Sequence, residues 1–174
     1  SERERVREEV RKLLERLREL LERHRRKLEK LNRELEKVLE DHRRTLERLK
    51  EELERSNVDE KVVREAKRRL DETHKKLRRL IEEVKERDKR SHDELRELIR
   101  EVEEKLREIL ELLERGKDID TVLEEARKLI EKAERDIRRL AKENEKTIEE
   151  VKERLKKLME ENKRLIEEIK ERTR

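Results

Sequence analysis

The sequence predicts an all-α protein, a single chain that runs up, down and up again as an antiparallel three-helix bundle. Three observations predict this fold. Apolar residues recur every three or four positions through three segments of about 55 residues each, which is the period of an amphipathic helix. Only two short breaks separate the segments, and the apolar pattern repeats every eighteen residues. The expected helices cover about residues 2–56, 59–115 and 120–173 of a single bundle, 1–174.

The first helix is expected to begin after Ser1, which forms a capping box with Glu4. One apolar stripe then follows the helix period to its end. It consists of Val6, Val10, Leu13, Leu17, Leu20, Leu28, Leu31, Leu35, Val38, Leu46, Leu49 and Leu53.

The first break, residues 56–59, leads into the second helix. Asn57 tolerates the left-handed conformation, Asp59 is a candidate N-cap, and Val58 and Val63 are spaced as a hydrophobic staple around that cap. The second stripe comprises Val62, Ala66, Leu70, Leu77, Ile81, Val84, Leu95, Ile99, Val102, Leu106, Ile109 and Leu113.

The second break contains the only glycine, Gly116, which suits a helix C-terminus, and Asp120 is expected to cap the third helix. The third stripe comprises Val122, Ala126, Leu129, Ala133, Ile137, Leu140, Ile148, Val151, Leu155, Leu158, Leu165 and Ile169. Because both connections are short, each helix must fold back on the previous one. A repeat of eighteen combines one heptad with one eleven-residue repeat, whose supercoils have opposite hands, so the helices should be nearly straight.

The composition excludes several classes of protein. The chain has no cysteine, proline or aromatic residue, and 61% of it is charged, with a net charge of only +4. Interleaved charges of both signs offer no basic stripe for nucleic acid. No apolar run approaches the length of a membrane span, and the N-terminus does not resemble a signal peptide. We expect a soluble protein compatible with the cytosol, although the sequence does not indicate its location.

Six polar residues interrupt the stripes in pairs that are eighteen residues apart: His24 and His42, His74 and His92, and Asn144 and Asn162. In an antiparallel hairpin, facing residues have numbers with a constant sum. The two breaks predict sums near 116 and 236, which His24, His92 and Asn144 satisfy together. The second layer, His42, His74 and Asn162, satisfies the same sums. Each layer can close a hydrogen-bond network, because neutral histidine and asparagine both donate and accept.

Further polar residues lie near the layers. Asp88 and Thr147 occupy stripe positions that are leucine one repeat away, so we expect them to extend the first layer, with Asp88 accepting from His92. Candidate edge members of the networks are Thr73, Ser91, Thr45 and Asn32.

Several interpretations of the histidines are compatible with the sequence. They could be solvated, could form a structural network that fixes helix pairing, or could form a network that responds to pH, since the imidazole pKa lies near neutrality. A metal or haem site is a weaker alternative, because asparagine is a poor zinc ligand and no cluster of small residues makes room for a porphyrin. Nothing indicates a catalytic nucleophile with an oriented base, so we expect no enzyme activity, no cofactor and no metal.

The repeat, the Glu/Lys/Arg-rich surface, the leucine-rich core and the capped short loops resemble de novo designed helical bundles. The layers His24/His92/Asn144 and His42/His74/Asn162 resemble the buried histidine networks of pH-responsive members of that class. The resemblance implies that acid charges the histidines and disrupts the bundle or its assembly. Some members disturb endosomal membranes on acidification, but no helix here has the wide apolar face or aromatic anchors of that subgroup.

The sequence therefore predicts a structural scaffold whose buried His/Asn networks give helix-pairing specificity and pH-dependent stability. Each apolar stripe is about as wide as the face that a helix buries in a closed three-helix core. Little apolar surface is then left for other molecules, which favours a monomer with no required partner. The alternatives are a homo-oligomeric assembly module and a bundle that disrupts membranes when acidified. We expect no membrane binding at neutral pH.

Overall fold

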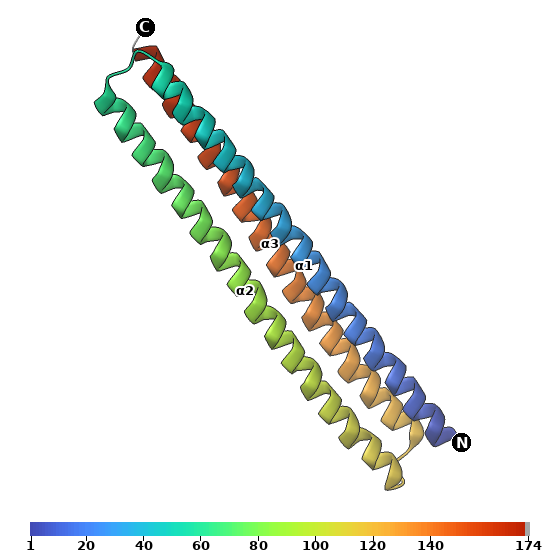
Figure 1. Ribbon diagram of the computed structural model, residues 1–174. Coiled ribbons are helices and arrows are strands. Elements are labelled where there is room, and N and C mark those ends of the chain that lie inside the picture. The colour runs from blue at the N-terminus through green and yellow to red at the C-terminus, as the bar shows by residue number, and fades with distance from the viewer. Residues whose placement is uncertain (173–174) are drawn as a thin grey trace. The chain divides into compact units, whose positions relative to one another are not determined.

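The computed structural model describes residues 1–172 and contains three long helices (Figure 1). They are α1 (Glu2–Arg55), α2 (Glu60–Glu114) and α3 (Ile119–Arg172). The predicted all-α three-helix bundle is confirmed, and the expected helix boundaries agree to within about one residue. The last residue expected in the third helix, residue 173, lies outside the described residues.

The chain divides into two compact units, and every helix contributes to both. Unit 1 consists of Ser1–Glu29 and Arg87–Glu145, and unit 2 of Lys30–Glu86 and Lys146–Arg174. The two polar layers are distributed one to each unit. His24, His92 and Asn144 belong to unit 1, and their repeat equivalents belong to unit 2.

Contacts within each unit establish the helix register. Most cross-helix ion pairs between α1 and α2 join residues whose numbers sum to 121, as in Arg18–Glu103 of unit 1 and Lys50–Asp71 of unit 2. These segments are therefore antiparallel. Between α1 and α3 the separation in sequence is constant at 118 residues, in Glu9–Arg127 and in Glu34–Lys152, so these segments are parallel. The same up-down-up register therefore holds in both units.

Unit 1 has an aliphatic core made by one face of each helical segment. Leu17, Leu95 and Ile137 are fully buried within it. Two small residues of α3, Ala126 and Ala133, are also buried in this core. In unit 2 the buried cluster near the first break contains Leu46, Leu53, Ala66, Leu70 and Ile166. Among the described residues the only exposed large hydrophobic side chain is Val62, 40% exposed. The apolar stripes are therefore almost entirely covered by one another.

Three helix ends follow the predicted chemistry. Glu4 donates its backbone N–H to Oγ of Ser1, while the Ser1 amino group contacts the Glu4 carboxylate, as a capping box requires. Asp59 accepts from the backbone N–H of Lys61. Gly116 has a φ of 89°, and its neighbour Lys117 donates to the Leu112 carbonyl, which is the Schellman arrangement.

Two details of the breaks differ from the prediction. The cap of α3 is Asp118, not Asp120, because the Asp118 carbonyl accepts from the N–H of Val122 and its carboxylate accepts from the Thr121 hydroxyl. Asp120 lies inside the first turn, where its charge suits the helix dipole. Asn57 is not left-handed, since no non-glycine residue among those described has positive φ. Instead, Ser56 ends α1 by donating its hydroxyl to the Leu53 carbonyl.

Candidate functional site: two histidine layers

The layer of unit 2 is a chain of hydrogen-bonding groups that crosses all three helices. His42 projects from α1 into the core and is only 3% exposed. Its Nδ1 lies 3.2 Å from Nδ1 of His74 on α2, and its Nε2 lies 3.4 Å from Nδ2 of Asn162 on α3. The three residues that the sequence placed in one layer are therefore in contact, with His42 at the centre.

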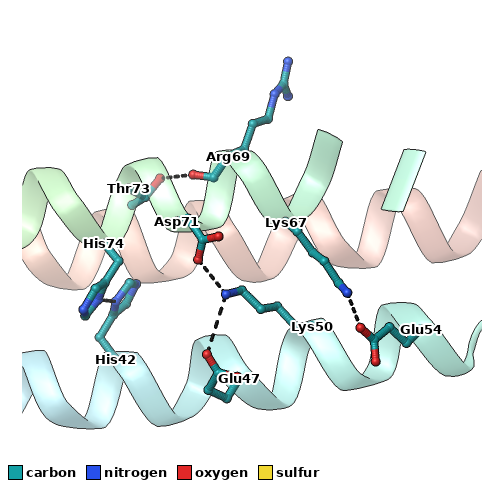
Figure 2. A network of polar contacts seen from close by, with 9 residues as sticks. All are labelled: His42, Glu47, Lys50, Glu54, Lys67, Arg69, Asp71, Thr73 and His74. Carbon is teal, nitrogen blue, oxygen red and sulfur yellow. Dashed lines mark hydrogen bonds and ion pairs between the residues drawn. The ribbon is translucent and has the colours of Figure 1, made fainter. Parts of the chain in front are cut away.

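The two imidazole rings of unit 2 meet edge to edge (Figure 2). Their planes are inclined by only 3° and their centres are 5.5 Å apart. The distance between the ring centres is longer than the 3.2 Å between the two Nδ1 atoms by about twice the distance from a ring centre to its own nitrogen. Both nitrogens therefore lie close to the line that joins the ring centres. The rings are consequently coplanar, and the lone-pair direction of one nitrogen points at the other. This is the geometry of a linear N–H···N hydrogen bond.

Burial dominates the electrostatics of His42. Desolvation, followed by the proximity of His74, lowers the pKa of His42 to about 4 from the ordinary 6.5. The pKa of His74 is also lowered, first by burial and then by the charges of Arg78 on α2 and Arg43 on α1. Asp71 acts in the opposite sense on His74, but its carboxylate is shared with Lys50 (Figure 2). Both rings are therefore neutral at pH 7.

The layer of unit 1 uses the same positions but a different pattern of bonds. Asn144 on α3 donates from Nδ2 to Oγ of Ser91 on α2 at 2.8 Å, and the same Nδ2 lies 3.3 Å from Nε2 of His24 on α1. All three residues are buried. The expected contact between His24 and Asn144 is confirmed, and Ser91 bonds directly to Asn144, which is the central residue of the layer.

Two imidazole nitrogens of unit 1 are buried without a hydrogen bond. Nδ1 of His24 and Nδ1 of His92 have no partner among the described residues. They are the repeat equivalents of the two Nδ1 atoms that bond to each other in unit 2. A buried polar atom left unpaired costs about 1–3 kcal/mol. The two units therefore differ at their histidines, because the Nδ1 atoms are paired in unit 2 and unpaired in unit 1.

The charges around the unit 1 histidines are mixed. Burial lowers the pKa of His24, and Glu145 on α3 partly opposes this, while His92 and Lys27 add to it. Burial also lowers the pKa of His92, assisted by Arg96 and Arg25 and opposed by Asp93 and Glu22. His92 lines a surface groove between α1 and α2, above Leu21 and Ile99.

The histidines of α2 are less buried than the sequence suggested. His74 and His92 are half-buried, whereas His24 and His42 are buried. On α2 the two pairs of neighbouring positions differ, because Thr73 and His74 are both half-buried, whereas Ser91 is buried beside a half-buried His92. At 91 the side chain is a small serine, which fits beneath the neighbouring helices. Spacing alone favoured His92 as the buried member of the layer. The small size of the Ser91 side chain is the signal that could have identified Ser91 as the buried residue.

The remaining expected members lie at different places. Thr73 donates its hydroxyl to the Arg69 carbonyl, and Thr45 accepts from Arg48, so each bonds to its own helix. Asn32 is half-buried in unit 2. Asp88 is buried in unit 1, while Thr147 belongs to unit 2 and is half-buried. The Asp88–Thr147 and Asp88–His92 contacts stay predictions.

The residues that the structure describes bear on two questions, metal ligands and membranes. They contain no group of three or more His, Cys, Asp or Glu side chains that could hold a metal ion. Within that part of the chain, no helix has the length and apolar character needed to cross a membrane. Comparison with known proteins gave no match to any family model, curated protein or solved structure.

Proposed function

We propose that the chain is a designed scaffold whose buried histidine layers make its folding stability depend on pH. The observation that carries the proposal is the buried environment of His42. This ring is 3% exposed, is hydrogen-bonded on both nitrogens and has a pKa lowered to about 4 by burial. The regular eighteen-residue repeat and the saturated charged surface support a designed origin.

The direction of the pH dependence follows from the lowered pKa. An unfolded chain would protonate His42 near the ordinary 6.5, whereas the folded chain resists protonation until about 4. Stability is therefore complete above about pH 6.5 and falls as the pH drops toward the folded value. With these two pKa values the loss attributable to His42 is about 2 kcal/mol at pH 5. His24, His74 and His92 add to it in the same direction, since the pKa of each is lowered.

Surface carboxylates define the pH range in which the histidines can be observed alone. The pKa values of Glu22, Glu40 and Glu65, among others, are lowered by neighbouring arginines from the ordinary 4.5. The stability that these ion pairs supply is present above that value and is lost below it. A comparison between about pH 7.5 and pH 5 therefore reports mainly on imidazoles.

The test is guanidinium unfolding at these two pH values, followed by circular dichroism because the chain has no aromatic fluorophore. The unmodified protein should be less stable at pH 5. The double variant His42→Gln/His74→Gln should lose most of that difference, since glutamine hydrogen-bonds without titrating in this range.

The repeat supplies a matched control, His24→Gln/His92→Gln. This variant should flatten the pH dependence less, because carboxylates oppose the lowering of both pKa values in unit 1. Equal unfolding midpoints of the unmodified protein at the two pH values would eliminate the pH-dependent function and leave the layers a structural role only.

We further propose that the scaffold is monomeric and requires no partner. The apolar stripes cover one another within each unit, and Val62 is the only large apolar side chain exposed among the described residues. Association or membrane insertion would need a larger apolar surface. Acid could supply one only by opening the helices, so the membrane-disrupting alternative is confined to low pH.

A further inference from the structure

The hydrogen bonds of the unit 2 layer have a direction, and Asn162 supplies it. The Asn162 amide nitrogen carries two hydrogens and no lone pair available for acceptance, so its contact with Nε2 of His42 must be a donation. Nε2 of His42 is therefore an acceptor without a hydrogen. A neutral imidazole has one N–H, so the hydrogen of His42 must be on Nδ1.

The same reasoning extends to His74. Nδ1 of His42 faces only Nδ1 of His74, along a nearly linear path of 3.2 Å. Because His42 donates on this path, Nδ1 of His74 must accept. The hydrogen of neutral His74 is then on Nε2.

We infer that Asn162 is the positioning residue that sets the proton order of this layer, from the Asn162 amide through His42 Nδ1–H to His74 Nδ1. The inference deepens the proposed function and rests on it only for its biological consequence. In this order both accepting nitrogens of the layer are already occupied. A solvent proton can be received on Nε2 of His42 only if the Asn162 amide rotates and presents its oxygen, which then accepts from the new N–H. Asn162 thereby also controls proton uptake.

Unit 1 lacks this arrangement although it has the same three residue types. The Asn144 amide contacts Nε2 of His24, but Nδ1 of His24 and Nδ1 of His92 have no partner among the described residues. The direction set by the amide therefore ends at the first ring. The two layers differ in proton order, and Asn144 provides the matched control position.

The test is nitrogen-15 NMR of histidine-labelled protein at neutral pH, where each ring nitrogen reports whether it carries a hydrogen. We expect a protonated Nδ1 and a bare Nε2 on His42, with the reverse on His74, and a scalar coupling between the two Nδ1 atoms. A hydrogen on Nε2 of His42 in the unmodified protein would overturn the inference.

The substitution Asn162→Asp changes the direction with little change in shape, because a carboxylate can only accept. Nε2 of His42 should then become protonated, and the loss of stability between about pH 7.5 and pH 5 should decrease, because the carboxylate stabilises charged His42. Asn144→Asp should leave the tautomers of His42 and His74 unchanged. Altered unit 2 tautomers in Asn144→Asp would contradict the assignment to Asn162, as would an unchanged His42 in Asn162→Asp.

The inference and the proposed function can fail separately. Stability that is independent of pH, together with a hydrogen on Nδ1 of His42, would remove the proposed function and support the inference. Stability that falls with acid, together with a hydrogen on Nε2 of His42, would overturn the inference and support the function. The spectrum of the unmodified protein decides the tautomers even where a variant does not fold.

Discussion

Replacing His24 with leucine should cost the protein less stability than the same replacement at His42. The two positions are one repeat apart, and both side chains project from α1 into a core of aliphatic residues. His42 makes two hydrogen bonds, one to His74 and one to Asn162, whereas His24 makes one, to Asn144. Nδ1 of His24 has no partner among the described residues.

The magnitude follows from these bonds. The substitution His42→Leu removes two hydrogen bonds, and His24→Leu removes one, a difference of about 1 kcal/mol. His24→Leu also removes a buried unpaired nitrogen, which is worth about 1–3 kcal/mol. The apolar gain from leucine is similar at both positions and cancels. We therefore expect His24→Leu to be the more stable variant by about 2–4 kcal/mol.

The assay is guanidinium unfolding at about pH 7.5, where all four histidines are neutral and no protonation contributes. The two variants should have similar slopes with denaturant, so that the difference lies in the midpoints. Equal midpoints, or a lower midpoint for His24→Leu, would refute the reasoning that the unpaired nitrogen of unit 1 destabilises the fold.

Two further predictions concern the edge positions and the state of assembly. Ser91→Ala should lower the free energy of unfolding by about 1–2 kcal/mol, because it removes the acceptor of Asn144. Thr73→Ala, at the equivalent position of the repeat, should lower it less, because Thr73 bonds only to its own helix. The denaturant midpoints of the two variants compare these losses directly. Light scattering at neutral pH should give the mass of one chain, 21.8 kDa, and a dimer or trimer at micromolar concentration would instead support the assembly module.

Much of the candidate site could be predicted from spacing. The separations of eighteen residues and the constant sums correctly assigned His42, His74 and Asn162 to one layer, and His24 and Asn144 to the other, because the register of an antiparallel helix pair is fixed by its short loop. The details at the breaks were less predictable. Asp118 and Asp120 are both reasonable caps, and only the hydrogen bonds of Asp118 distinguish them.

The sequence by itself determined the three helices, their order of folding back and the residues that share a cross-section, since these depend on periodicity, capping residues and loop length. It did not determine which polar atoms meet. The two Nδ1 atoms bond in unit 2 and their equivalents do not in unit 1, although both layers contain two histidines and one asparagine. A hydrogen bond requires its atoms to be placed within a few tenths of an ångström and within a narrow angle. Side-chain rotamers and small rotations of each helix set that placement, and they depend on how the surrounding aliphatic side chains pack in each unit.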